Sequence, residues 1–385
     1  MRKILSILLG IVLLLGYFAP IAQAEEIVER GRSAVLMEVA TGQILYEKNP
    51  GELLEPASMT KMMPMYLILE AIENGRLSWD DEVTVSEYAA SLGGTQIFLE
   101  PGEVMSVRDL FASVAIASAN DAVTALGEKL SGTYQSFVEL MNERAREFGM
   151  NDTVFKNSTG LPAEGHVTTA FDMALLASRL ITRFPEVTEF TALYEDYVRE
   201  NTDDPFWLVN TNKLIRYVDG VDGLKTGYTD SAGSCLAATA KRGDMRVVAV
   251  VMGADTSQNR NREVAQLIEF AFAQYQLHPR IEKGAVVGTH QNILARGRNF
   301  EVVTTAPINL LLEAGQAVGE ETHEIVLHDD IQVPIQPGDV VGHLIYYIDG
   351  ANHLAVDLTV AEEVPRTSFI TLWMNMLGKL FFGGH

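Results

Sequence analysis

The alternation of apolar and polar positions predicts β-hairpins at both ends of a first, large domain. Residues 33–39 and 43–47 are short apolar runs on either side of a Thr-Gly turn, and residues 234–240 and 246–252 flank a turn of Arg, Gly and Asp. Short runs joined by tight turns are typical of hairpins. Because tight turns join antiparallel neighbours, we expect the sheet of this domain to be mainly antiparallel.

The stretch between these hairpins has a helical pattern. It runs from residue 58 to about residue 183, and sequences of capping-box form at 106–109 and 169–172 mark helix starts within it. A helical insertion between two hairpins predicts the mixed fold class, α/β (α+β), and we assign residues 25–278 to this domain.

The pattern changes again after residue 278. Residues 279–364 contain many short β-branched runs, with turns at 337–339 and 349–350, and lack strong helical periodicity. Their length, roughly 85 residues, lies within the usual range for a domain. We therefore expect a smaller, separate all-β C-terminal domain.

The last segment, residues 365–385, is predicted to form an amphipathic helix. Its apolar side chains recur at spacings of three and four residues, which places them on one helical face. A terminal helix packed on the protein body would fit this pattern, but Trp and Phe on such a face favour a helix that lies on a membrane surface. The apolar face comprises Phe369, Leu372, Trp373, Met376, Leu377, Leu380 and Phe381.

The first 24 residues have the form of a secretory signal peptide. Arg2 and Lys3 precede an apolar run, residues 4–18, and Ala22-Gln23-Ala24 has the small-x-small pattern of a cleavage site. A retained membrane helix is the alternative, but the run is short for a span of about 20 residues. We expect a secreted, extracytoplasmic protein that is held peripherally at the membrane through its C-terminus.

Charge and cysteine content exclude several classes of protein. A net charge of −22 argues against nucleic acid as a partner, since phosphate binding relies on clustered Lys and Arg. The same acidity would repel an anionic bilayer, so membrane attachment must come from apolar burial. The single cysteine, Cys235, precludes an intramolecular disulfide and has the apolar neighbours of a buried side chain.

Three short motifs carry the chemistry. Ser58-Met59-Thr60-Lys61, Ser118-Ala119-Asn120 and Lys225-Thr226-Gly227 follow one another along the chain. They match the S-x-x-K, S-x-N and K-T-G elements of penicillin-binding proteins and serine β-lactamases. Each of the first two is common by chance, but the ordered set of three is not. The chain therefore resembles a serine acyl-transfer enzyme with a β-lactamase/transpeptidase-like domain.

The first motif supplies a nucleophile and a base. A serine hydroxyl attacks a carbonyl only when a nearby base takes its proton. Residues i and i+3 of a helix share a face, so Ser58 and Lys61 can meet. A lysine amine, with an ordinary pKa of about 10.4, serves as a base only when burial or a second cation lowers that pKa. The methionines around Ser58 would provide the burial, and Lys225, distant in sequence, would provide the second positive charge.

The resemblance also implies roles for the other motif residues. Ser118 would relay a proton to the leaving amine, and Asn120 would bind Lys61 and the substrate amide carbonyl. Helix-start geometry at Ser58 favours its backbone N–H as one half of an oxyanion hole, and the resemblance points to the N–H of Tyr228 as the other. The resemblance also implies that Lys225 and Thr226 bind a terminal carboxylate, together with an arginine.

The identity of that arginine stays open between two positions. Arg262 follows the strand end in the way the family's arginine does, and we take it as the predicted residue, although Arg260 lies close enough in sequence to make the contact. Gly227 would allow a peptide substrate to approach the strand closely and extend the sheet.

Four longer stretches narrow the resemblance to serine-type D-Ala-D-Ala carboxypeptidases, the low-molecular-weight penicillin-binding proteins of the peptidase S11 family. They are residues 155–161, 166–174, 210–213 and 221–224. The resemblance implies removal of the terminal D-Ala from peptidoglycan pentapeptides and inhibition by β-lactams that acylate Ser58. A peptidoglycan DD-endopeptidase or transpeptidase with the same site is the alternative. The second motif lacks the central Asp of a class A β-lactamase, so efficient penicillin hydrolysis is not expected.

Other hydrolytic chemistries fit the sequence less well. A Ser-His-Asp triad could recruit His166, but Ser58 is not within a G-x-S-x-G elbow. No H-E-x-x-H zinc motif occurs, and we predict neither a metal site nor a cofactor.

Overall fold

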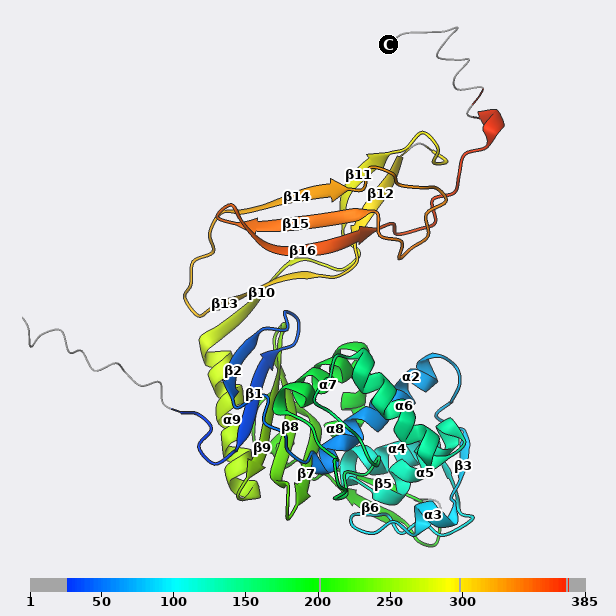
Figure 1. The fold of residues 1–385 in the computed structure, drawn as a ribbon, viewed down its shortest axis with the longest axis vertical. Helices are drawn as coiled ribbons and strands as arrows, with labels where there is room; N and C mark the ends of the chain where they lie inside the picture. The colour runs from blue at the N-terminus through cyan, green and yellow to red at the C-terminus, as the bar shows by residue number, and fades with distance from the viewer. Residues whose placement is uncertain (1–25, 201, 298, 372, 374–385) are drawn as a thin grey trace, which may run out of the picture.

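The computed structural model describes residues 26–200, 202–297, 299–371 and 373, and these fold into two domains (Figure 1). The larger domain combines an antiparallel sheet with helices, and the smaller one consists of strands and loops. The predicted α+β fold class with an all-β C-terminal domain is confirmed. The predicted signal peptide, residues 1–24, lies outside the described residues.

A five-stranded antiparallel sheet forms the centre of the larger domain, with strand order β2-β1-β9-β8-β7. Both predicted hairpins are present, as β1–β2 and β8–β9. Strand β7 was not predicted as part of a hairpin, yet it occupies one edge of the sheet and carries the third motif. The strands are β1 (Ser33–Glu38), β2 (Ile44–Lys48), β7 (Val221–Thr229), β8 (Gly233–Arg242) and β9 (Met245–Ala254).

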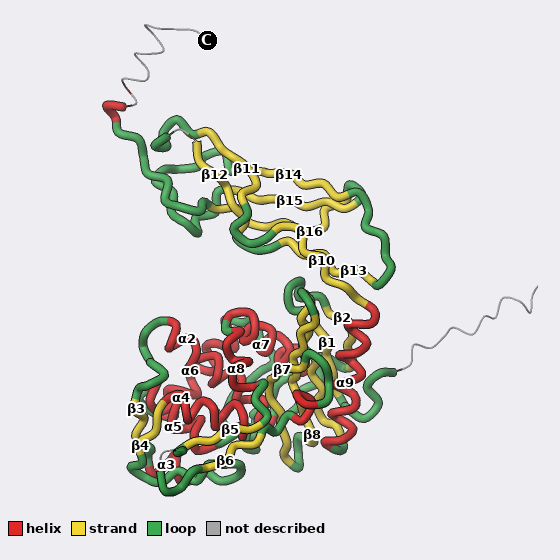
Figure 2. The backbone as a smooth tube through the Cα atoms, turned by 180° about the vertical axis from the view of Figure 1, so that it is seen from behind, coloured by secondary structure: helices red, strands yellow, loops and turns green. Residues whose placement is uncertain are grey.

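Both faces of this sheet are covered. Helix α9 (Ser257–Gln274) packs on one face, and the helices of the insertion pack on the other (Figures 1 and 2). Neighbouring positions of one strand divide between the two layers: Leu36 joins the α9 side, and Met37 joins the helical side. Side chains of a strand point alternately to opposite faces, so strands enclosed on both sides are apolar almost throughout.

The helical insertion is present where the sequence pattern predicts it. Two predicted helix starts are capped, because Ser106 Oγ accepts the Asp109 N–H and Thr169 Oγ1 accepts the Asp172 N–H. The helical elements are η1 (Ala57–Lys61), α2 (Met62–Glu73), α3 (Glu87–Ala90), α4 (Val107–Ala112), η2 (Ser113–Ala117), α5 (Asn120–Ser131), α6 (Tyr134–Glu147), α7 (Ala170–Arg183), η3 (Pro185–Val187), α8 (Thr188–Thr191) and η4 (Lys213–Arg216).

Two short antiparallel strand pairs accompany these helices, and the periodicity did not predict them. One lies within the helical stretch and the other precedes η4; each strand has only three or four residues, too few to establish an alternating pattern. They are formed by β3 (Glu82–Thr84) with β4 (Val104–Ser106) and by β5 (Glu195–Val198) with β6 (Phe206–Val209).

The C-terminal domain encloses its own apolar core between a five-stranded sheet, of order β11-β12-β16-β15-β14, and the pair β10–β13. Buried side chains such as Leu310, Leu344 and Leu358 meet there. None of the three motifs lies in this domain. Its strands are β10 (Tyr275–Ile281), β11 (Val286–Gln291), β12 (Asn299–Thr304), β13 (Ile308–Glu313), β14 (Glu321–Leu327), β15 (Gly342–Ile348) and β16 (Ala351–Thr359).

The start of the predicted terminal helix falls within the described residues, and most of that helix falls outside them. Ser368 Oγ accepts the Thr371 N–H, as an N-cap does, and the side chains of Phe369 and Trp373 are 82% and 55% exposed. These aromatic side chains are therefore not packed on the protein body. Among the described residues, no helix is long and apolar enough to cross a bilayer.

The contact between α5 and α6 allows a test of packing. A Cβ atom on Gly127 would lie 2.3 Å from the Phe137 ring, and Phe137 is fully buried. Gly127→Ala should gain about 1 kcal/mol of helix propensity but lose more to the clash, so that the free energy of unfolding falls by about 1–2 kcal/mol. Urea denaturation measures the change.

Gly51→Ala is the matched control, because a Cβ atom there has no neighbour within 4 Å. Its free energy of unfolding should stay within about 0.5 kcal/mol of the parent value. Equal stability of the Gly127 and Gly51 variants would contradict the packing described for α5 and α6.

Candidate active site

The first motif brings its serine and lysine together as predicted, although in a tighter helix than an α-helix. Ser58 and Lys61 lie in the 3₁₀ helix η1, where side chains three residues apart are stacked directly. Lys61 Nζ lies 3.1 Å from Ser58 Oγ, at hydrogen-bonding distance. Ser58 is only partly buried, whereas Lys61 is fully buried. A substrate can therefore reach the hydroxyl while the amine stays out of water.

Burial favours the neutral form of the Lys61 amine. The pKa of its amine is lowered well below the ordinary value, first by loss of water around the group and second by the positive charge of Lys225. Asp121 acts in the opposite direction, but more weakly. Loss of solvation destabilises the ammonium form. A neutral amine at hydrogen-bonding distance from a hydroxyl can accept its proton.

Two glycines allow the backbone around Ser58 to be tightly enclosed. A Cβ atom on Gly227 of β7 would lie 3.2 Å from Ser58 N, and one on Gly160 would lie 2.8 Å from the same atom. Gly160 also has a φ of +83°, which disfavours any side chain. Strand β7 and the 157–161 loop therefore approach the nucleophile from two sides.

The second motif lies at an irregular turn between helices. The π-helical turn η2 ends at Ser118, whose φ of +70° is unusual for a residue with a side chain. Ser118 Oγ is buried and has no hydrogen-bond partner among the described residues. The N-cap of α5 is Ala119, so Ser118 does not serve merely to start that helix. Its hydroxyl remains available to another group.

Asn120 is held differently from what the resemblance predicts. Its Nδ2 donates to the Gly93 carbonyl at 2.7 Å. The hydrogen bonds that Lys61 Nζ makes to described residues go to Ser58 Oγ and, at 2.6 Å, to the Thr159 carbonyl. The predicted contact between Asn120 and Lys61 is therefore not made in this structure.

The third motif lines the other side of the site. Lys225 is buried on β7, where burial first and the charge of Arg260 second lower the pKa of its amine to about 7. Thr226 Oγ1 donates to Thr211 Oγ1 at 2.7 Å. The side chain of Tyr228 is 63% exposed and donates to Asp230, so the hydroxyl of Tyr228 turns toward solvent. Any role of Tyr228 in the site therefore belongs to its backbone N–H.

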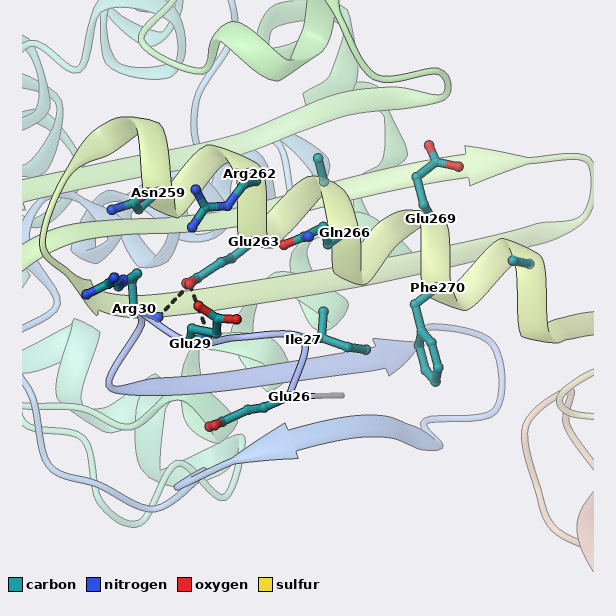
Figure 3. Close-up of a pocket in the computed structure, with 12 residues that line it drawn as sticks. Glu26, Ile27, Glu29, Arg30, Asn259, Arg262, Glu263, Gln266, Glu269 and Phe270 are labelled. Atoms are coloured by element: carbon teal, nitrogen blue, oxygen red, sulfur yellow. Dashed lines mark hydrogen bonds between the residues drawn. The ribbon is translucent and has the colours of Figure 1, made fainter. Parts of the chain in front are cut away.

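Arg262 is not at the site, and that prediction is wrong. Its exposed side chain lines a pocket between α9 and the N-terminal segment, together with Arg30 and Glu26 (Figure 3). Arg260 is buried instead, and its Nη1 donates to the Cys235 carbonyl at 3.3 Å, on the strand that pairs with β7. Two residues turn about 200° around an α-helix, so 260 and 262 point in nearly opposite directions.

His166 is close to the first motif but cannot complete a catalytic triad. Its Nδ1 accepts the Lys156 N–H at 3.1 Å, and its Nε2 lies 2.9 Å from Thr60 Oγ1. Burial first, and then the charge of Lys156, lower the pKa of the imidazole to about 4. His166 is therefore neutral at pH 7 and holds the 157–166 loop against η1.

Two residues at the site were missed by sequence reasoning. The Thr159 carbonyl binds Lys61, and the buried Asp121 carboxylate acts electrostatically on it. The stretch that contains Thr159 was recognised as typical of the family, but a backbone carbonyl has no sequence signature. Asp121 directly follows the second motif and has the appearance of an ordinary first-turn acid of a helix.

Comparison with known proteins agrees with this geometry. Residues 21–256 match the peptidase S11 family, D-alanyl-D-alanine carboxypeptidase, and residues 275–366 match the C-terminal domain of penicillin-binding protein 5. The chain is 45% identical over 386 residues to the D-alanyl-D-alanine carboxypeptidase DacF of Bacillus subtilis, and the match covers 98% of each protein.

Solved structures give the same result. Penicillin-binding protein 5 from Haemophilus influenzae superposes with a TM-score of 0.72 at 29% identity, over 87% of this chain and 98% of the other. Penicillin-binding protein D2 from Listeria monocytogenes, solved in an ampicillin-bound form, is 37% identical with a TM-score of 0.55, over 63% of this chain and 98% of the other. The chain therefore belongs to the peptidase S11 family of D-alanyl-D-alanine carboxypeptidases, the low-molecular-weight penicillin-binding proteins.

Proposed function

We propose that this protein is a serine carboxypeptidase that removes the terminal D-Ala from peptidoglycan pentapeptides through an acyl-enzyme on Ser58. The observation that carries the proposal is the 3.1 Å separation of Ser58 Oγ and a buried Lys61 amine whose pKa is lowered. Family membership supports the same reaction and substrate. The base, the nucleophile and the proton relay of this reaction are all side chains.

Acylation begins when Lys61 takes the proton of Ser58 Oγ. The oxygen attacks the carbonyl of the penultimate D-Ala, and the backbone N–H groups of Ser58 and Tyr228 bind the oxyanion. Each such donor contributes about 3 kcal/mol where charge develops. Ser118, whose hydroxyl has no partner among the described residues, gives its proton to the departing amine and receives in return the proton that Lys61 took from Ser58. Water then cleaves the ester and regenerates Ser58.

The substrate binds along the edge of β7. An extended peptide can pair with an edge strand through main-chain hydrogen bonds, and Gly227 lets this strand pack closely against the backbone at Ser58. Asn120 positions the amide carbonyl of the stem. Lys225 and Thr226 bind the terminal carboxylate, with Arg260 behind them in place of Arg262.

β-Lactams mimic this acyl donor and acylate Ser58, as the ampicillin-bound form of a relative supports. A DD-endopeptidase or transpeptidase would use the same groups. Product analysis separates them, because a carboxypeptidase releases D-Ala from a pentapeptide faster than it cleaves or forms crosslinks.

The protein acts outside the cytoplasmic membrane. A signal peptide at residues 1–24 directs secretion, and the amphipathic segment at residues 365–385 holds the enzyme at the membrane surface. Exposure of Phe369 and Trp373 supports this arrangement, since large apolar side chains in water are stabilised by burial in a lipid interface.

Replacement of the nucleophile tests the reaction. Ser58→Ala should abolish both labelling by a fluorescent penicillin and D-Ala release from a pentapeptide, because no hydroxyl remains to be acylated. Peptide mapping of the labelled parent protein should place the adduct on Ser58. Persistent labelling of the variant, or an adduct on another residue, would refute the assignment.

The two arginines offer a matched pair. Arg260→Gln should reduce kcat/KM for D-Ala release by roughly 10- to 100-fold, since charge-assisted hydrogen bonds contribute about 1.5–3 kcal/mol. Arg262→Gln, on the opposite face of α9, should leave kcat/KM within about twofold of the parent value. A larger loss in Arg262→Gln than in Arg260→Gln would reverse the assignment.

The anchor can be separated from the catalytic domain. A protein that ends at residue 367 should be acylated by penicillin as fast as the full chain, yet fail to sediment with lipid vesicles that the full chain binds. Retained vesicle binding would place the membrane contact elsewhere, and loss of the folded state would identify the segment as part of the core.

A further inference from the structure

Segment 93–99 lies against the second motif and is fastened to it at alternate residues. Asn120 holds the first part of the segment: its backbone N–H donates to the Thr95 carbonyl at 2.7 Å, and its Nδ2 donates to the Gly93 carbonyl at 2.7 Å. The side chain that should orient the substrate is thus itself oriented by this segment.

Asp121 holds the second part. Its carboxylate accepts the backbone N–H groups of Ile97 and Leu99, each at 3.1 Å, and that of Ala122 at 2.9 Å. The carboxylate is fully buried. Burial raises the pKa of this carboxyl, and the three N–H donors act in the opposite direction by stabilising the ionised form. A buried charge that accepts two main-chain donors from one segment constrains the position of that segment closely.

The conformation of the segment shows the effect of this constraint. Ile97 and Leu99 are buried, whereas Phe98 between them is 65% exposed and has a φ of +56°. This backbone region is uncommon for a bulky side chain and costs of order 1–3 kcal/mol. The surrounding contacts must therefore compensate, and the Asp121 carboxylate supplies two of them.

Asp121 also lies within electrostatic reach of the base. Its negative charge stabilises the ammonium form of Lys61, against the effect of Lys225. The other charged groups around the segment are Arg199, which donates to the Ile97 carbonyl, and Glu103, which pairs with Arg199. The neutral His166 borders η1 through Thr60.

We propose that Asp121 is a positioning residue of the acyl-transfer site: its carboxylate fixes segment 93–99 as the wall that orients the Asn120 amide, and its charge balances Lys225 at Lys61. The proposal rests on the proposed function. Asp121, the residue after the second motif, would thus act both on the position of segment 93–99 and on the protonation of Lys61.

The rate of acylation by a fluorescent penicillin tests whether Asp121 positions segment 93–99 and Asn120. Asp121→Asn should slow acylation at pH 7 by roughly 10- to 100-fold, the cost of a misplacement of about 1 Å. Asp172→Asn is the matched control, since Asp172 is also buried and bonded to a neighbouring loop through Thr153. It should acylate as the parent does. Equal rates in the Asp121 variant and the parent would overturn the proposal.

The pH profile separates positioning from a merely structural role. The neutral amine of Lys61 is the active form, so acylation falls as pH drops through the pKa of that amine. Removal of the Asp121 charge lowers this pKa further, and the acidic limb of Asp121→Asn should move to lower pH. Asp121→Glu keeps the charge and should retain the parent limb. An unmoved limb in Asp121→Asn would show that the charge does not reach Lys61.

A second variant tests the same proposal if the Asp121→Asn protein does not fold. Glu103→Gln weakens the pair with Arg199, which donates to the Ile97 carbonyl, and so loosens the segment at Ile97 without a change to Asp121. This variant should slow acylation without moving the pH limb. Acylation at the parent rate would exclude a role for the segment as a wall. Labelling of the parent protein at Ser58 tests the proposed function by itself, so the two failures are distinguishable.

Discussion

The buried amine of Lys61 is the group on which the rest of the site depends. An ammonium in a protein interior is costly unless it is paired, so burial lowers the pKa of this amine and favours its neutral form. The Lys61 amine is hydrogen-bonded within η1 to Ser58 and across to the Thr159 carbonyl of the 157–161 loop. The positive charge of Lys225 on β7 lowers the pKa of the amine further. Each motif therefore contributes to the chemistry of one nitrogen atom as well as to substrate contacts.

The same requirement explains the architecture around the nucleophile. The helical insertion provides the rigid turn that carries Ser58 and Lys61, and the sheet provides an edge that a peptide can extend. The edge strand approaches the backbone at Ser58 closely because Gly227 has no side chain, and the 157–161 loop approaches it closely because Gly160 has none. A larger residue at Gly227 would push the edge strand away from the serine, and one at Gly160 would push the 157–161 loop away; either change would open the amine to water.

Charged side chains near the nucleophile influence the protonation of one another. Lys225 destabilises the charged form of Lys61, Arg260 does the same for Lys225, and Asp121 opposes the first effect. The neighbouring Lys225 and Arg260 suit a substrate that ends in a carboxylate, because an incoming negative charge stabilises the charged forms of both side chains. The C-terminal domain takes no part in this balance, since its core is separate and none of the motifs lies in it.

The sequence by itself determined the hairpins, the helical insertion, the all-β C-terminal domain and the pairing of Ser58 with Lys61. These features depend on local periodicity and on residues three apart, which a linear pattern records directly. Only the tertiary structure decided between Arg260 and Arg262, because helix phase relative to β8 determines which guanidinium is buried. The roles of Thr159 and Asp121 were also invisible in the sequence, since a carbonyl and a buried carboxylate acquire their function from segments that folding brings to them.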